Sequence, residues 1–151
     1  LYEIKNRSKD KPFSLLIADT LMLGKLGIRM TDIAEKYITR FWPGALTVIM
    51  EDDAGRKIGL RLPENDIARG LIRCSNVALA CPSANLSGEE PSNSAIEVKK
   101  IFDGLIDLVI DDRIVHVGRE SSIIDLTSNP PRLLREGVIS RKELDNLYDN
   151  K

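Results

Sequence analysis

Short apolar runs and helically spaced apolar residues follow one another along this chain of 151 residues. Short runs rich in aliphatic residues, bounded by turn-forming ones, are typical of β-strands. The predicted strands lie at residues 13–17, 45–50, 58–62, 77–81, 108–111, 121–126 and 133–135. A turn at residues 52–55 separates two of these runs and predicts a β-hairpin.

Four helices are predicted where apolar residues recur at helical spacing behind a capping residue. Pro43 and Gly44 end the first of them, because proline lacks the amide hydrogen that a helix needs. The predicted N-terminal caps are Thr31 or Asp32, Asn65 or Asp66, Ser94 and Ser140. The third helix would carry an apolar stripe of Ala95, Val98, Phe102 and Leu105.

The order of these elements predicts the fold class. Strands alternate with helices, but a hairpin and several short late strands interrupt the alternation, which favours an α/β fold with a mixed parallel and antiparallel sheet flanked by helices. The length suits a single domain over residues 1–151. Leu1 to Ile4 resemble the last turn of a helix and no Met precedes them, so we expect an N-terminally truncated chain.

Composition limits the classes of protein to which this chain can belong. Twenty-two basic and 23 acidic residues give a net charge of −1, which does not indicate a nucleic-acid partner. We expect a cytoplasmic protein, because there is neither a membrane-length apolar run nor a secretory signal. Cys74 and Cys81 are expected to be reduced and buried, without a metal. His116, the only histidine, is interpreted as a surface or structural residue.

Three stretches carry candidate chemistry, each with a plain alternative. Residues 80–92 join a strand to a helix N-terminus, where backbone N–H groups can bind an anion, but ordinary connections look the same. Four cations between Lys5 and Lys11 form either an anion-binding loop or a solvated surface. Arg61 points away from the apolar side of its strand, towards solvent or into a cleft. P-loop and Rossmann motifs are absent.

Six motifs occur in an order that resembles one known family. They are Lys5-x-Arg7 with Lys11-Pro12, Phe41-Trp42-Pro43-Gly44-Ala45-Leu46-Thr47, Leu60-Arg61-Leu62-Pro63, Pro82-Ser83-Ala84-Asn85-Leu86-Ser87-Gly88, Glu120-Ser121-Ser122-Ile123-Ile124-Asp125-Leu126 and Leu134-Arg135-Glu136-Gly137. Together they resemble the YrdC-like family, the threonylcarbamoyl-AMP synthases, over nearly the whole chain. Each motif alone is weak, whereas their common order is specific.

The resemblance implies an activity and a fold. The enzyme would be a nucleotidyltransferase that joins L-threonine, bicarbonate and ATP into threonylcarbamoyl-adenylate and releases pyrophosphate. This is the first step towards threonylcarbamoyl-adenosine at position 37 of certain tRNAs. ATP would enter as a substrate with Mg²⁺, there would be no prosthetic group, and a threonylcarbamoyl-transferase complex would act downstream. The implied fold is an open, twisted α/β sheet around a concave basic cavity.

The resemblance also implies roles for individual residues. Catalysis would rest on Lys5 and Arg7, which neutralise the ATP phosphates. The implied ATP-binding residues are Arg7, Lys11, Lys57, Ser83, Asn85, Ser92 and Arg135. The threonine carboxylate would be held by Arg61, with Ser121 and the backbone at Cys81 completing the pocket; arginine suits such a bidentate contact.

The chain departs from the family pattern at several positions. The family's P-T-E-T-x-Y-G-L strand would lie upstream of Leu1. Ser8 stands where the family usually has Pro, Ser122 where it usually has Thr, and Lys57 where a small hydroxyl residue is common. Leu16 stands where some members have a polar residue. Glu89-Glu90 makes the spacing between Gly88 and Ser92 one residue longer than in the family. Two alternatives therefore remain beside the synthase: a paralogue that handles another carbamoyl-adenylate, and a non-catalytic module that binds double-stranded RNA or tRNA.

Overall fold

The computed structural model describes residues 1–92, 94–111 and 120–149. These residues form two compact units. The loop unit consists of residues 1–13 and 82–111, and the sheet unit consists of residues 14–81 and 120–149. The prediction of one domain over the whole chain stays a prediction.

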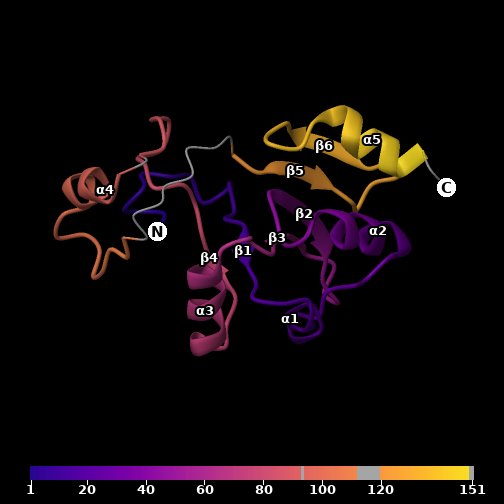
Figure 1. Cartoon of the computed structure of the whole chain (residues 1–151), viewed down its shortest axis with the longest axis horizontal. Helices are drawn as coiled ribbons and strands as arrows, with labels where there is room; N and C mark the ends of the chain where they lie inside the picture. The colour runs from indigo at the N-terminus through magenta and orange to yellow at the C-terminus, as the bar shows by residue number, and fades with distance from the viewer. Residues whose placement is uncertain (93, 112–119, 150–151) are drawn as a thin grey trace. The chain divides into compact units, whose positions relative to one another are not determined.

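A six-stranded mixed sheet forms the sheet unit, with the strand order β4-β1-β3-β2-β5-β6. β1 runs parallel to β3 and β2 runs parallel to β5, whereas the other neighbours are antiparallel. Figure 1 shows this order from β6 across to β4. The strands are β1 (Leu15–Leu16), β2 (Leu46–Glu51), β3 (Lys57–Arg61), β4 (Leu79–Ala80), β5 (Ser122–Asp125) and β6 (Arg132–Arg135). The predicted open mixed sheet is confirmed.

The predicted β-hairpin is confirmed by β2 and β3, which pair from Val48 opposite Leu60 to Glu51 opposite Lys57. Its turn is closed by the buried carboxylate of Asp52. That carboxylate accepts hydrogen bonds from the backbone N–H groups of Ala54 and Arg56 and from the Arg56 side chain. These local contacts therefore favour a turn of this one length.

The four predicted helices are present, and each is capped as the sequence indicates. Thr31 and Asn65 accept hydrogen bonds from the N–H groups of Ala34 and Ala68. Ser140 and Glu143 form the expected capping box. The helices are α2 (Asp32–Phe41), α3 (Asp66–Ser75) and α5 (Arg141–Asp149) in the sheet unit, and α4 (Ala95–Ile101), capped by Ser94, in the loop unit.

Some local predictions were wrong. Residues 108–111 form no strand, and Leu108 is 74% exposed. Leu1 to Ile4 lie in turns rather than at the end of a helix. The stripe predicted on α4 is only partly buried: Phe102 is buried and Ala95 and Val98 are half-buried, but Leu105, which lies beyond the end of the helix, is exposed. A short helix, α1 (Leu21–Lys25), was missed, because five residues that include Gly24 leave little helical periodicity.

The hydrophobic core lies on one face of the sheet. Side chains alternate between the two faces along a strand, and the core side of the central strands is lined by Leu46, Val48, Met50, Leu60 and Ile124. α2 lies over β2 and against α5 (Figure 1). Between these helices Tyr37 is almost fully buried, and its hydroxyl donates to the Leu144 carbonyl at 2.8 Å.

Ser122, at the start of β5, ties this strand to the turn that follows β6. Its side chain is fully buried. The hydroxyl donates to the Ile139 carbonyl at 2.6 Å and accepts from the N–H groups of Gly137 and Ile139 at 2.9 and 3.0 Å. A Cβ at residue 137 would lie 2.0 Å from the Glu120 carbonyl oxygen, so this approach requires glycine. The contact fixes where β6 leaves the sheet.

Ser122→Ala should lower the free energy of unfolding by about 2–4 kcal/mol, because two buried N–H groups and one carbonyl lose their partner. Urea unfolding at pH 7 measures the change. Ser128→Ala, which removes an exposed hydroxyl after the same strand, serves as the control and should cost less than about 0.5 kcal/mol. Equal losses in the two variants would contradict the assignment.

Tyr37→Phe should make the free energy of unfolding fall less steeply with pH above pH 10. Burial, with the negative charges of Asp145 and Asp149, raises the pKa of Tyr37 to about 12. The unfolded chain ionises near pH 10, so stability falls between about pH 10 and 12 as the folded state keeps its proton. The variant should lose about 1 kcal/mol at pH 8 with the hydrogen bond but decline less steeply above pH 10. Unfolding curves at pH 8, 10 and 11 check this, and parallel declines would contradict it.

Candidate functional site

A transverse row of side chains crosses the sheet unit on the face opposite the core. The strand register places Leu16 opposite Arg61, Thr47 opposite Ile123, and Ile123 opposite Arg135. The pairing of Val48 with Leu60 continues the row from Thr47 to Arg61. Paired residues in a sheet point to the same face, so two arginines from β3 and β6 share one side of the sheet with a buried threonine.

Arg61 is half-buried, and its Nε donates to the Gly44 carbonyl at 2.8 Å. Burial lowers the pKa of its guanidinium; the charge of Arg135 acts in the same direction, while Cys81 opposes it. Within the described part of the chain, no carboxylate forms an ion pair with Arg61. The sequence left its orientation open between solvent and cleft; in the structure the guanidinium is partly desolvated and lies near a second one.

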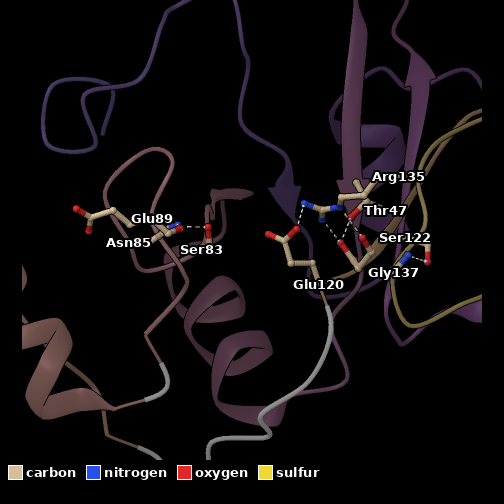
Figure 2. Close-up of polar contacts among 9 residues, drawn as sticks. Thr47, Ser83, Asn85, Glu89, Glu120, Ser122, Arg135 and Gly137 are labelled. Carbon is tan, nitrogen blue, oxygen red and sulfur yellow. Dashed lines mark hydrogen bonds and ion pairs between the residues drawn. The ribbon is translucent and has the colours of Figure 1, made fainter.

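Arg135 is held by Ser121, the residue just before β5. Its Nε donates to the Ser121 carbonyl at 3.0 Å and its Nη2 to the Ser121 hydroxyl at 3.3 Å. That hydroxyl also lies 2.9 Å from the hydroxyl of buried Thr47. Nη1 donates to the Glu120 carboxylate at 2.6 Å (Figure 2). The structure thus brings together Arg61, Ser121 and Arg135, each of which the sequence assigned to substrate binding.

Lys57 lies apart from the arginines, whereas Cys81 lies close enough to Arg61 for each to shift the pKa of the other. Cys81 follows β4, and its N–H donates to the Ser14 carbonyl at 3.1 Å. Both cysteines are exposed, so the prediction that they are buried was wrong; neither forms a disulfide. Lys57 lies at the other end of β3 from Arg61, about 13 Å along the strand, where it pairs with Asp125 at 3.2 Å. The structure does not bring Lys57 to the arginine pair.

In the loop unit, the predicted catalytic Lys5 is a buried cation. Only 4% of the residue is exposed. Its ammonium donates to the Ser83 carbonyl at 2.6 Å, to the Asn85 side-chain oxygen at 2.9 Å and to the Asn85 carbonyl. Burial, followed by the charge of Arg7, lowers the pKa of Lys5. All three N–H donors of an ammonium are engaged, so a phosphate would have to replace one of these carbonyl groups.

Arg7 and Lys11, the two other basic residues of the loop unit that the resemblance assigns to ATP, are more open than Lys5. Arg7 lies over the Phe13 ring, 4.8 Å from its centroid, and Phe13 in turn contacts the ring of Tyr2. Its Nε donates to the Lys11 carbonyl at 2.8 Å. Lys11 is exposed. The segment is therefore folded around an aromatic anchor and keeps guanidinium donors available to an anion.

The predicted nucleotide-binding loop is organised by Asn85, which is buried. Its side-chain oxygen accepts from the Ser83 hydroxyl at 2.7 Å, and its amide donates to the Glu89 carbonyl (Figure 2). Ser92 lies farther along, where its hydroxyl donates to the Glu97 carboxylate at 2.8 Å. The loop unit thus groups Lys5, Ser83 and Asn85 in one network, and Ser92 joins this loop to the start of α4, because its N–H donates to the Ala84 carbonyl at 3.3 Å. Their roles in ATP binding stay predictions.

Sequence reasoning missed two members of these networks, Thr47 and Glu120. Both occur in the quoted motifs, but their partners lie 74 and 15 residues away, so only the strand register reveals them. His116 lies outside the described residues. Among the residues described, no group of three or more His, Cys, Asp or Glu side chains is placed to hold a metal ion, and no helix has the length and apolar character needed to cross a membrane.

Comparison with known proteins gives matching sequences and folds. Threonylcarbamoyl-AMP synthase of Pyrococcus abyssi is 35% identical over 97% of this chain and 46% of its own length. The Bacillus subtilis protein of the same name is 34% identical over 96% of this chain and 45% of its length. The chain therefore spans less than half the length of these curated relatives.

Comparison with solved structures finds the same relatives. Pyrococcus abyssi Sua5, crystallised with L-threonine, has a TM-score of 0.89 at 35% identity and covers 97% of this chain and 46% of that one. Escherichia coli YciO has a TM-score of 0.82 at 24% identity, over 95% of this chain and 74% of its own, which is a likeness of fold. The model of the Sua5/YciO/YrdC family, described as telomere recombination, matches residues 1–137. This chain belongs to the Sua5/YciO/YrdC family.

Proposed function

We propose that this chain carries out the synthesis of threonylcarbamoyl-AMP from L-threonine, bicarbonate and ATP, with release of pyrophosphate. The observation that carries the proposal is the pair of half-buried guanidinium groups, Arg61 and Arg135, on one face of the sheet unit. Support comes from relatives named for this activity and from a family structure crystallised with L-threonine.

In this reaction the main task of the protein is to align anions. A carbamate oxygen of carboxylated threonine would attack the α-phosphorus of ATP, a P–O bond would form, and the bond to pyrophosphate would break. Bringing two anions together needs fixed cations and little covalent chemistry. Arg61 suits the threonine carboxylate, since a partly desolvated guanidinium binds a carboxylate in two parallel hydrogen bonds. Arg135 suits a phosphate in the same way. In the loop unit, Lys5 would bind a phosphate only by giving up one of its carbonyl partners.

Magnesium would enter with the nucleotide. Among the described residues no acidic cluster is placed to hold a cation alone, and Mg²⁺ is commonly bound through substrate phosphates. We therefore infer that Mg–ATP is the substrate. The tRNA modification pathway, the downstream transferase complex and a cytoplasmic site of action remain proposals.

Arg61→Ala should abolish the effect of threonine on ATP binding. In the unaltered chain, isothermal titration should show tighter ATP binding when threonine and bicarbonate are present. A charged hydrogen bond is worth about 1.5–3 kcal/mol, so the variant should lose at least about tenfold of the threonine-dependent gain. Arg132→Ala, which removes an exposed arginine from β6, is the matched control and should keep the gain.

Two outcomes would count against this function. ATP binding that ignores threonine in the unaltered chain would favour a paralogue that acts on another carbamoyl-adenylate. If the chain binds no ATP, the proposed synthase function is wrong for this chain. Threonine-dependent pyrophosphate release, measured in the same samples, tests the chemical step itself.

A further inference from the structure

Ser121 holds one edge of the Arg135 guanidinium. Two nitrogens on one edge of the guanidinium, Nε and Nη2, donate to the carbonyl and hydroxyl oxygens of this single residue. Ser121 is itself buried, and its hydroxyl is held against that of Thr47. Because two hydrogen bonds fix the plane of a guanidinium, no third contact is needed to aim it.

Glu120 nevertheless accepts a hydrogen bond from Nη1, the third nitrogen of the Arg135 guanidinium. Its carboxylate lies 2.6 Å from Nη1, and the two side chains are 48% and 37% exposed. A guanidinium offers five N–H donors in a fixed fork, and the edge that includes Nη1 is the one left for a second bidentate partner. Glu120 thus takes the Nη1 hydrogen bond that a phosphate oxygen could otherwise accept (Figure 2).

The charges on this face give a reason for a carboxylate here. Arg61 and Arg135 lie on the same side of the sheet, and each positive charge disfavours the other. Glu120 neutralises one member of the pair. The ion pair is about half solvated, so it is weak enough to exchange for another anion.

We propose that Glu120 is an internal counter-ion of Arg135 that an incoming phosphate must displace from Nη1. The residue therefore lowers the affinity of the site for anions and neutralises Arg135 between turnovers. This inference rests on the proposed nucleotide-binding function, because a nucleotide phosphate is the ligand expected at Arg135.

A counter-ion and an orienting residue respond differently to substitution. Glu120→Gln removes the charge but keeps an oxygen that can accept from Nη1, whereas Glu120→Ala removes both. A counter-ion predicts tighter anion binding in both variants. An orienting role predicts that the Gln variant behaves like the unaltered chain and that the Ala variant binds more weakly.

Titration of the chain with inorganic pyrophosphate at low salt, followed by calorimetry, tests the proposal. Glu120→Gln and Glu120→Ala should each bind about two- to fivefold more tightly, the range that a surface ion pair is worth. The gain should shrink at high salt and vanish when Arg135→Ala is added. Glu136→Gln is the matched control, since Glu136 lies next to Arg135 but accepts from the Arg141 N–H at 3.1 Å; its affinity should not change.

Three results would overturn the counter-ion role: unchanged affinity in Glu120→Gln, weaker binding in Glu120→Ala, or no pyrophosphate binding by any variant. Failure of the proposed function looks different. In that case the Glu120 variants still gain pyrophosphate affinity, while ATP binding by the unaltered chain shows no response to threonine.

Discussion

The three hydrogen bonds of the Ser122 hydroxyl fix the geometry on which the candidate site depends. They hold the start of β5 against the turn after β6, at an approach so close that only glycine fits at residue 137. Ser121 immediately precedes this point, and Arg135 lies two residues before Gly137. A buried polar contact with every group satisfied gives one arrangement rather than several, and it thereby fixes where Arg135 lies on its face of the sheet.

Local signals in the sequence predicted most of the fold. Helix caps depend on residues three positions apart, and the hairpin depends on a five-residue turn, so Thr31, Asn65, Ser140 and the segment around Asp52 could be identified without tertiary information. The failure at residues 108–111 has the opposite cause. A short apolar run resembles a strand, but forming one requires a partner, and pairing is decided elsewhere in the chain.

The candidate site was only partly predictable. Periodicity showed that Arg61 points away from the core, but not that Arg135 shares its face, because this depends on the order in which β3, β2, β5 and β6 lie side by side. The motif resemblance identified Arg61, Ser121 and Arg135. It could not show that Lys5 donates all three of its hydrogen bonds to the Ser83–Asn85 loop, or that Glu120 accepts a hydrogen bond from Arg135. These are contacts across long separations, set by packing.

The closed β2–β3 turn has a consequence for how this sequence can vary in length. Alternation along a strand has a period of two, so a single inserted or deleted residue that shifts β3 along β2 exchanges its two faces. Arg61 would then enter the hydrophobic core, and Leu60 would take its place beside Thr47. The Asp52 carboxylate, which fits one turn length, thereby controls which side of the sheet carries the positive charge. Residues far from any ligand can in this way decide whether the site exists.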